Sequence, residues 1–369
     1  KRQLFITISM ELLLTPVLNL CGGAKVAEET FRYATEYARI TLIGIPFVCI
    51  SMTVNSIIRA QGNPRYAMIS NISGCLLNVV LDAWFVLGLG WGVAGAAWAT
   101  IIGQILNFVL AVAYIPRLKG IEFKREYALL NSKTLFSFLP LGISSFFTQF
   151  GSTIVVICMN NLTVKYGLES VYGPDIPLAA FGIVMKVNSI IVSVMVGLGI
   201  GSQPIVGYNY GAKKFDRVRE AFWFCVTFST VFLIVISVLG AVFSGDLVGV
   251  FRKDEAVIEI GQVALRFQCV TFALTGWIIL NNMMMQTIGK TFYATILAAS
   301  RQGLCFIPAL LILPKFFGLA VIQAAQAAAD LCTFVITTVI YSAVMKHIES
   351  ETFKHEAVSR LMGKTAEAG

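Results

Sequence analysis

The chain alternates long apolar runs with short polar stretches along its whole length. We place ten apolar runs, each of about the length that crosses the hydrocarbon core of a bilayer. The predicted spans are Leu4–Leu20, Tyr37–Ile58, Tyr66–Leu87, Val93–Ile115, Leu135–Asn160, Leu178–Tyr208, Ala221–Phe243, Ile260–Ile288, Phe292–Leu313 and Gly318–Met345. The pattern therefore predicts an all-α polytopic membrane protein.

The composition agrees with this prediction and excludes several other functions. Of 369 residues, 57% are hydrophobic and 13% are charged, about half the charged share of a soluble domain. The net charge of +8 does not indicate nucleic acid as a partner, because the basic residues fall in loops between apolar runs. The eight cysteines are scattered singly, and the two histidines, His347 and His355, follow the last span. We therefore expect no zinc site within the membrane, no disulfide framework and no cofactor.

The distribution of Lys and Arg over the loops predicts the orientation and the domains. Eighteen of them lie on the side that holds the charged loop 116–133 and the polar end of the chain, and six lie on the opposite side. Because positive loops stay inside, the linker and the tail are predicted to be cytoplasmic. The predicted domains are an incomplete N-terminal lobe (1–115), a linker (116–133), a C-terminal lobe (134–345) and a tail (346–369).

The chain contains an internal repeat with a constant shift of 227 residues. The identities are polar or lie at turns, and they pair Glu28 with Glu255, Arg39 with Arg266, Asn55 with Asn282, Gly62 with Gly289, Tyr66 with Tyr293, and Ala67 with Ala294. Spans one to four thus repeat as spans seven to ten, whereas spans five and six have no partner. We expect a fragment, since the chain starts at Lys1 without Met, with two helices missing before it. The full-length protein would have twelve helices in two parallel six-helix repeats, as in many secondary transporters.

One buried carboxylate is the main candidate for chemistry. Asp82 lies inside an apolar span, where an ionisable residue is a functional hypothesis by default. Asn78 lies one turn earlier on the same helix face, and Thr100 lies at similar depth beyond the hairpin turn near Gly90. Their oxygen atoms could hold a sodium ion or a proton. The alternative is a hydrogen-bond cluster that joins two helices.

Two longer motifs resemble those of the multidrug and toxic compound extrusion (MATE) family. They are Leu77–Thr100, which includes the run Gly90-Trp91-Gly92-Val93-Ala94-Gly95, and Gly201–Ala212, which reads GSQPIVGYNYGA. The second motif is most similar to the bacterial MepA-like branch. The resemblance implies a two-lobed, twelve-helix exporter of the bacterial plasma membrane that exchanges H+ or Na+ for amphipathic, often cationic drugs and toxins by alternating access.

The resemblance also implies a role for three residues. Asn78, Asp82 and Thr100 match the first-lobe site that binds the coupling cation in prokaryotic members, and Na+ at Asp82 is the only metal that we expect. The family's first-helix aspartate would fall before Lys1. Some members use carboxylates in the second lobe, but no acid is found near Gln149 or Trp277.

The second half has its own polar residues within spans. Gln149, Lys186, Arg301 and Asp330 are candidates for lining a substrate cavity. Asp330 could instead pair with Arg301 or Lys186, because an unpaired charge in lipid is costly. Glu11 is the only other carboxylate well inside a span, and we assign no role to it.

Three functional classes remain at this point. A cation-coupled drug antiporter fits the motifs, and a lipid-linked saccharide flippase of the same superfamily is the first alternative. The second is a membrane-embedded prenyl or lipid transferase, which needs clustered acidic metal ligands or a His/Asp pair, and neither is present. We expect small amphipathic substrates and the lipid bilayer as partners, and a monomer.

Overall fold

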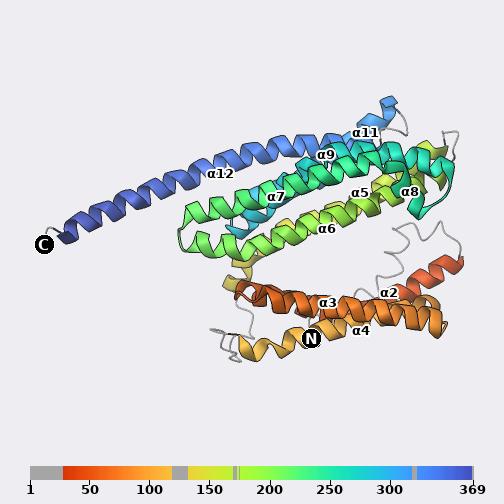
Figure 1. Ribbon diagram of the computed structural model, residues 1–369, viewed down its shortest axis with the longest axis horizontal. Helices are drawn as coiled ribbons and strands as arrows, with labels where there is room; N and C mark the ends of the chain where they lie inside the picture. The colour runs from red at the N-terminus through yellow and green to blue at the C-terminus, as the bar shows by residue number, and fades with distance from the viewer. Residues whose placement is uncertain (1–27, 119–131, 169–172, 174, 318–321, 368–369) are drawn as a thin grey trace. The chain divides into compact units, whose positions relative to one another are not determined.

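The computed structural model describes residues 28–118, 132–168, 173, 175–317 and 322–367 (Figure 1). The regular elements in these ranges are all helical. The chain divides into two compact units, Lys1–Ala128 and Leu129–Gly369, and this division falls inside the predicted linker.

The first unit contains three long helices. They are α2 (Glu28–Ala60), α3 (Pro64–Asp82), which continues as a π-helical segment η2 (Ala83–Gly88), and α4 (Gly92–Ala113), followed by the short 3-10 helix η3 (Ile115–Arg117). Helix α4 packs against both α2 and α3. The predicted span Leu4–Leu20 and Glu11 lie outside the described residues.

Small residues let α3 and α4 approach closely. A Cβ atom added to Gly74 would come within 2.7 Å of the Gly103 carbonyl oxygen, and a Cβ on Gly103 would come within 2.6 Å of the Gly74 oxygen. Tyr66 Oη donates a hydrogen bond of 2.8 Å to the Leu110 carbonyl oxygen nearer the start of α3. Close backbone contact with interhelical hydrogen bonds is the usual way in which helices associate in lipid.

The second unit holds the remaining helices. In chain order they are α5 (Ser132–Leu168), α6 (Asp175–Gly211), α7 (Phe215–Val242), α8 (Ser244–Phe251), α9 (Glu255–Thr287), α10 (Thr291–Ala299), the π-helical segment η5 (Ser300–Leu304), α11 (Phe306–Phe317) and α12 (Ile322–Glu367). Helix α9 packs against α6, α7 and α12 (Figure 1). In its most apolar stretch 61% of the residues are buried, against 17–33% in the other membrane-length helices described. Helix α9 is therefore the core of this unit.

Among the described residues, eight helices are long and apolar enough to cross a membrane. This finding agrees with the predicted polytopic helical membrane protein. The predicted span Phe292–Leu313 contains most of α10 and α11, with the π-helical segment η5 between them. The last span, expected to end at Met345, continues as helix to Glu367. The sequence from Lys346 to Glu367 contains no proline and a single glycine, Gly363, so it holds few residues that end a helix.

The local structure repeats at the shift of 227 residues. Helices α2 and α9 end at positions that differ by this shift, Ala60 and Thr287. Each is followed by a glycine in the left-handed region, Gly62 at φ +84° and Gly289 at φ +77°. Helix α2 packs on α4, and α9 packs on α12. Matching helix ends, turns and packing partners are what an internal repeat requires.

Candidate functional site

Asp82 is the last residue of α3, and the π-helical segment η2 begins directly after it. Its Oδ1 atom is buried and has no hydrogen-bond partner among the described residues. Because a buried polar atom without a partner is costly, it marks a place where a proton or cation could bind. Segments of π-helix are frequent at functional sites, since they change the direction in which side chains point.

The other two predicted residues of this site contact each other. Asn78 Nδ2 lies 3.4 Å from Thr100 Oγ1, and this long hydrogen bond joins α3 to α4. Thr100 Oγ1 also donates to the Ala96 carbonyl oxygen at 2.9 Å. The structure thus brings Asn78 and Thr100 together, while Asp82 lies one turn further along α3.

A second polar cluster in the first unit was not predicted. Asn107 of α4 is its centre: its Oδ1 atom accepts hydrogen bonds from Asn55 Nδ2 (3.1 Å) and Ser70 Oγ (2.8 Å), and its Nδ2 atom donates to Asn71 Oδ1 (2.9 Å). The signal was present in the sequence as small polar residues on three neighbouring apolar spans. The sequence does not show that these residues meet, because they lie on three different spans whose register depends on tertiary packing. Through these hydrogen bonds, the Asn107 side chain connects α2, α3 and α4.

In the second unit, Asp330 pairs with Arg301. Arg301 Nε lies 3.3 Å from Asp330 Oδ1, and Gln326 Nε2 donates to the same oxygen at 3.2 Å. The Asp330 side chain is fully buried, and that of Arg301 is 14% exposed. Of the two pairing partners that we considered, the structure therefore places Arg301, rather than Lys186, beside the carboxylate. Gln149 of α5 and Lys186 of α6 are exposed within this unit, and their role in a substrate cavity stays a prediction.

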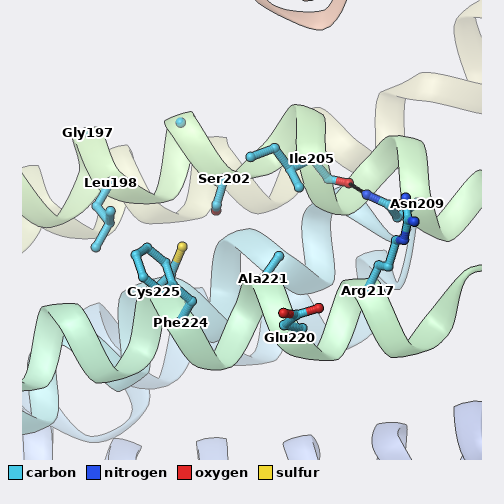
Figure 2. Close-up of a pocket in the computed structure, with 11 residues that line it drawn as sticks. Gly197, Leu198, Ser202, Ile205, Asn209, Arg217, Glu220, Ala221, Phe224 and Cys225 are labelled. Atoms are coloured by element: carbon cyan, nitrogen blue, oxygen red, sulfur yellow. Dashed lines mark hydrogen bonds between the residues drawn. The ribbon is translucent and has the colours of Figure 1, made fainter.

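A cavity of about 830 Å³ opens between α6 and α7 (Figure 2). Its α6 wall belongs largely to the second motif, through Gly201, Ser202, Ile205 and Asn209. The remaining lining residues are Gly197, Leu198, Arg217, Glu220, Ala221, Phe224 and Cys225. Figure 2 shows Asn209 and Arg217 at one end of this cavity and Gly197 and Leu198 at the other. We did not predict it, because a motif that matches a family does not indicate which of its faces is open.

Comparisons with known proteins agree with this fold. The model of the MatE family matches residues 3–84 and 140–311. The chain is 26% identical over 316 residues to the multidrug export protein MepA of Staphylococcus haemolyticus, and 25% identical over 315 residues to that of Staphylococcus aureus strain N315. Each match covers 85% of this chain and 68% of the relative.

Solved structures give the same result for the fold. An outward-facing multidrug resistance transporter of the MATE family and MOP superfamily matches with a TM-score of 0.85 at 20% identity. The match covers 94% of this chain and 76% of that protein. At this identity, the likeness concerns the fold alone.

Proposed function

Because this chain belongs to the MatE family of multidrug efflux transporters, we propose that it couples the export of amphipathic, often cationic molecules to the entry of H+ or Na+. As a family member it is a multi-pass membrane transporter of small molecules and not an enzyme, which excludes the membrane transferase. The named relatives are multidrug exporters, and this favours drug export over the saccharide flippase.

The observation that carries the cation coupling is the environment of Asp82. Its buried Oδ1 atom has no hydrogen-bond partner in the part of the chain that the structure describes. The amide of Asn78 and the hydroxyl of Thr100 lie on the same two helices and provide further oxygen atoms. A carboxylate, an amide and a hydroxyl are hard oxygen ligands that suit Na+, and the carboxylate alone suits a proton.

Binding of the cation at Asp82 must change the balance between conformations if it is to drive export. A ligand shifts a conformational equilibrium only by its difference in affinity for the two states. In our proposal the Asp82 carboxylate is neutral with its cation bound and charged without it, and the two forms favour different conformations. We further propose that the linker 116–133 and the tail 346–369 lie on the cytoplasmic side, as the distribution of basic loops predicts.

The test is transport by the protein reconstituted in proteoliposomes, with tetraphenylphosphonium as the amphipathic cation. Its efflux is measured under an imposed H+ gradient and, separately, under an imposed Na+ gradient. We expect one of the gradients to drive efflux in the parent protein. Asp82→Asn should abolish the gradient-driven part, because asparagine keeps the size of the side chain but cannot change its charge.

The matched control is Asp246→Asn, which removes an exposed carboxylate in the first turn of α8. This variant should transport like the parent. Efflux by Asp82→Asn at the parental rate, with the same dependence on the gradient, would show that Asp82 only joins helices. Absence of gradient-driven transport in the parent would contradict the proposed coupling itself.

A further inference from the structure

The cavity between α6 and α7 is an elongated groove that runs along both helices. On α6 its residues recur every four positions, at Gly197, Gly201, Ile205 and Asn209, and so form one stripe on the helix face. Twelve residues separate the ends of this stripe, which gives a length of about 18 Å at 1.5 Å per residue. This is close to the thickness of one leaflet's hydrocarbon, about 15 Å.

The groove is apolar inside the span and charged at its mouth. Ile205 and Phe224 line its walls and are 54% and 70% exposed. Arg217 and Glu220 lie in the first turns of α7, next to the α6–α7 turn. Between Gly211 and Ala221 there are four basic residues (Lys213, Lys214, Arg217 and Arg219) and two acidic ones (Asp216 and Glu220). The α6–α7 turn next to the groove thus has a net positive charge, while the two charged residues that line the groove, Arg217 and Glu220, balance each other.

Two glycines keep the floor of the groove open. A Cβ atom added to Gly197 or Gly201 would meet no other atom within 4 Å in this unit. Glycine usually weakens a helix relative to other residues, so two open glycines in one stripe cost stability without giving a close helix contact. The space above them can therefore accept a ligand without movement of the helices.

We propose that this groove binds an anionic phospholipid, with the headgroup phosphate at Arg217 and one acyl chain along Gly201 and Gly197. Basic residues next to the end of a membrane-spanning helix attract anionic headgroups. The apolar stripe provides the length that an acyl chain occupies in one leaflet. The inference goes beyond the proposed function, because the lipid is a bound partner and is not the exported molecule. The second motif then has a physical role, since four of its residues build this site.

The experiment measures lipid binding to the full chain in detergent by native mass spectrometry. The probes are dioleoyl phosphatidylglycerol and dioleoyl phosphatidylcholine, which differ only in the headgroup. We expect the parent to retain phosphatidylglycerol in preference to phosphatidylcholine. Arg217→Gln should weaken phosphatidylglycerol binding about fivefold, the effect of one basic residue at a membrane surface, and leave phosphatidylcholine unchanged.

Filling the groove tests its apolar part. Gly201→Leu and Gly197→Leu should each weaken phosphatidylglycerol binding about tenfold, which corresponds to displacing about two methylene groups of the acyl chain. The control is Gly182→Leu on the same helix, where an added Cβ also meets no atom within 4 Å but which does not line this groove. It should bind both lipids like the parent.

Several results would overturn the proposal. Equal retention of both lipids by the parent would exclude the anionic headgroup. Unchanged binding in both groove variants, or an equal loss in Gly182→Leu, would place the lipid elsewhere. If the two leucine variants lost tetraphenylphosphonium binding but kept phosphatidylglycerol binding, the groove would be assigned to exported molecules. If both leucine variants fail to fold, Arg217→Gln decides, because Arg217 is exposed and its replacement removes no buried contact.

Discussion

The two units each contain a carboxylate within the membrane-spanning helices, and the surroundings of the two differ. Asp330 is fully buried against Arg301 and Gln326, so its charge is balanced and its Oδ1 atom is occupied, although its Oδ2 atom is buried without a hydrogen-bond partner among the described residues. Asp82 has no ion pair among these residues, and its buried Oδ1 atom has no hydrogen-bond partner there. A carboxylate held by a cation stabilises helix packing, whereas one without such a partner is available to a proton or ion. We therefore expect Asp330 to have a structural role and Asp82 to bind the coupling cation.

The largest expected effect comes from breaking the Arg301–Asp330 pair. Asp330→Asn or Arg301→Met leaves a buried charge without its partner, which typically costs about 3–5 kcal/mol of folding free energy. Unfolding in mixed micelles with increasing SDS measures this cost. The double variant Arg301→Met/Asp330→Leu should lose less than either single variant, because no buried charge remains.

The effect of Asp82→Asn on the unfolding free energy is measured in the same SDS assay. This substitution removes no ion pair that the described part of the chain contains, so its unfolding free energy should stay within about 1 kcal/mol of the parent. If Asp82→Asn destabilised the protein as much as Asp330→Asn does, the two carboxylates would have the same structural role and the distinction drawn above would be wrong.

The second effect concerns the close contact of α3 and α4. Gly103→Ala places a methyl group against the Gly74 carbonyl oxygen, which is backbone and cannot rotate away. Overpacking of this kind costs about 1–3 kcal/mol. Since Asn78 and Thr100 meet across the same two helices, the variant should also reduce gradient-driven efflux. Gly182→Ala is the control, because its Cβ meets no atom within 4 Å, and it should be neutral or stabilising.

The sequence predicts the helical architecture well, because each span depends on one local property, the length of an apolar run. It does not predict the π-helical segment Ser300–Leu304, since the apolar character averaged over a span conceals a local change in backbone hydrogen bonding. Arg301 lies in this segment, and its partner Asp330 is 29 residues away. Depth counting placed Asp82 and Thr100 at similar depth across the hairpin, whereas the side chain that contacts Thr100 is that of Asn78, one turn earlier.

Sequence reasoning was weaker for features that depend on neighbouring helices. The Asn107 cluster needs α2, α3 and α4 in one register, and the groove between α6 and α7 needs these two helices to lie side by side. Both follow from tertiary packing and leave only small polar residues or glycines as a signal.

The third effect tests the internal repeat. Gly62 and Gly289 occupy equivalent turns in the left-handed region, where a residue with a Cβ atom costs about 1–2 kcal/mol. Gly62→Ala and Gly289→Ala should therefore destabilise by the same amount in the SDS assay. No other atom lies within 4 Å of an added Cβ at either position, so the backbone alone sets the cost. A clear difference between the two variants would show that the turns are not equivalent.

The smallest expected effect concerns the hydrogen bond between Asn78 and Thr100. At 3.4 Å it is long, and hydrogen bonds between membrane helices contribute only about 0.6 kcal/mol on average. Thr100→Val removes the hydroxyl at nearly constant volume, and Thr100→Ser keeps it as the control. If the pair only joins α3 to α4, Thr100→Val should lose this small free energy and transport like Thr100→Ser. If the hydroxyl also binds the coupling ion, Thr100→Val should require a steeper ion gradient for the same efflux. Its loss of unfolding free energy should be the same in both cases. A double-mutant cycle with Asn78→Ala separates the two roles, because helix joining predicts coupling in unfolding and ion binding predicts coupling in transport.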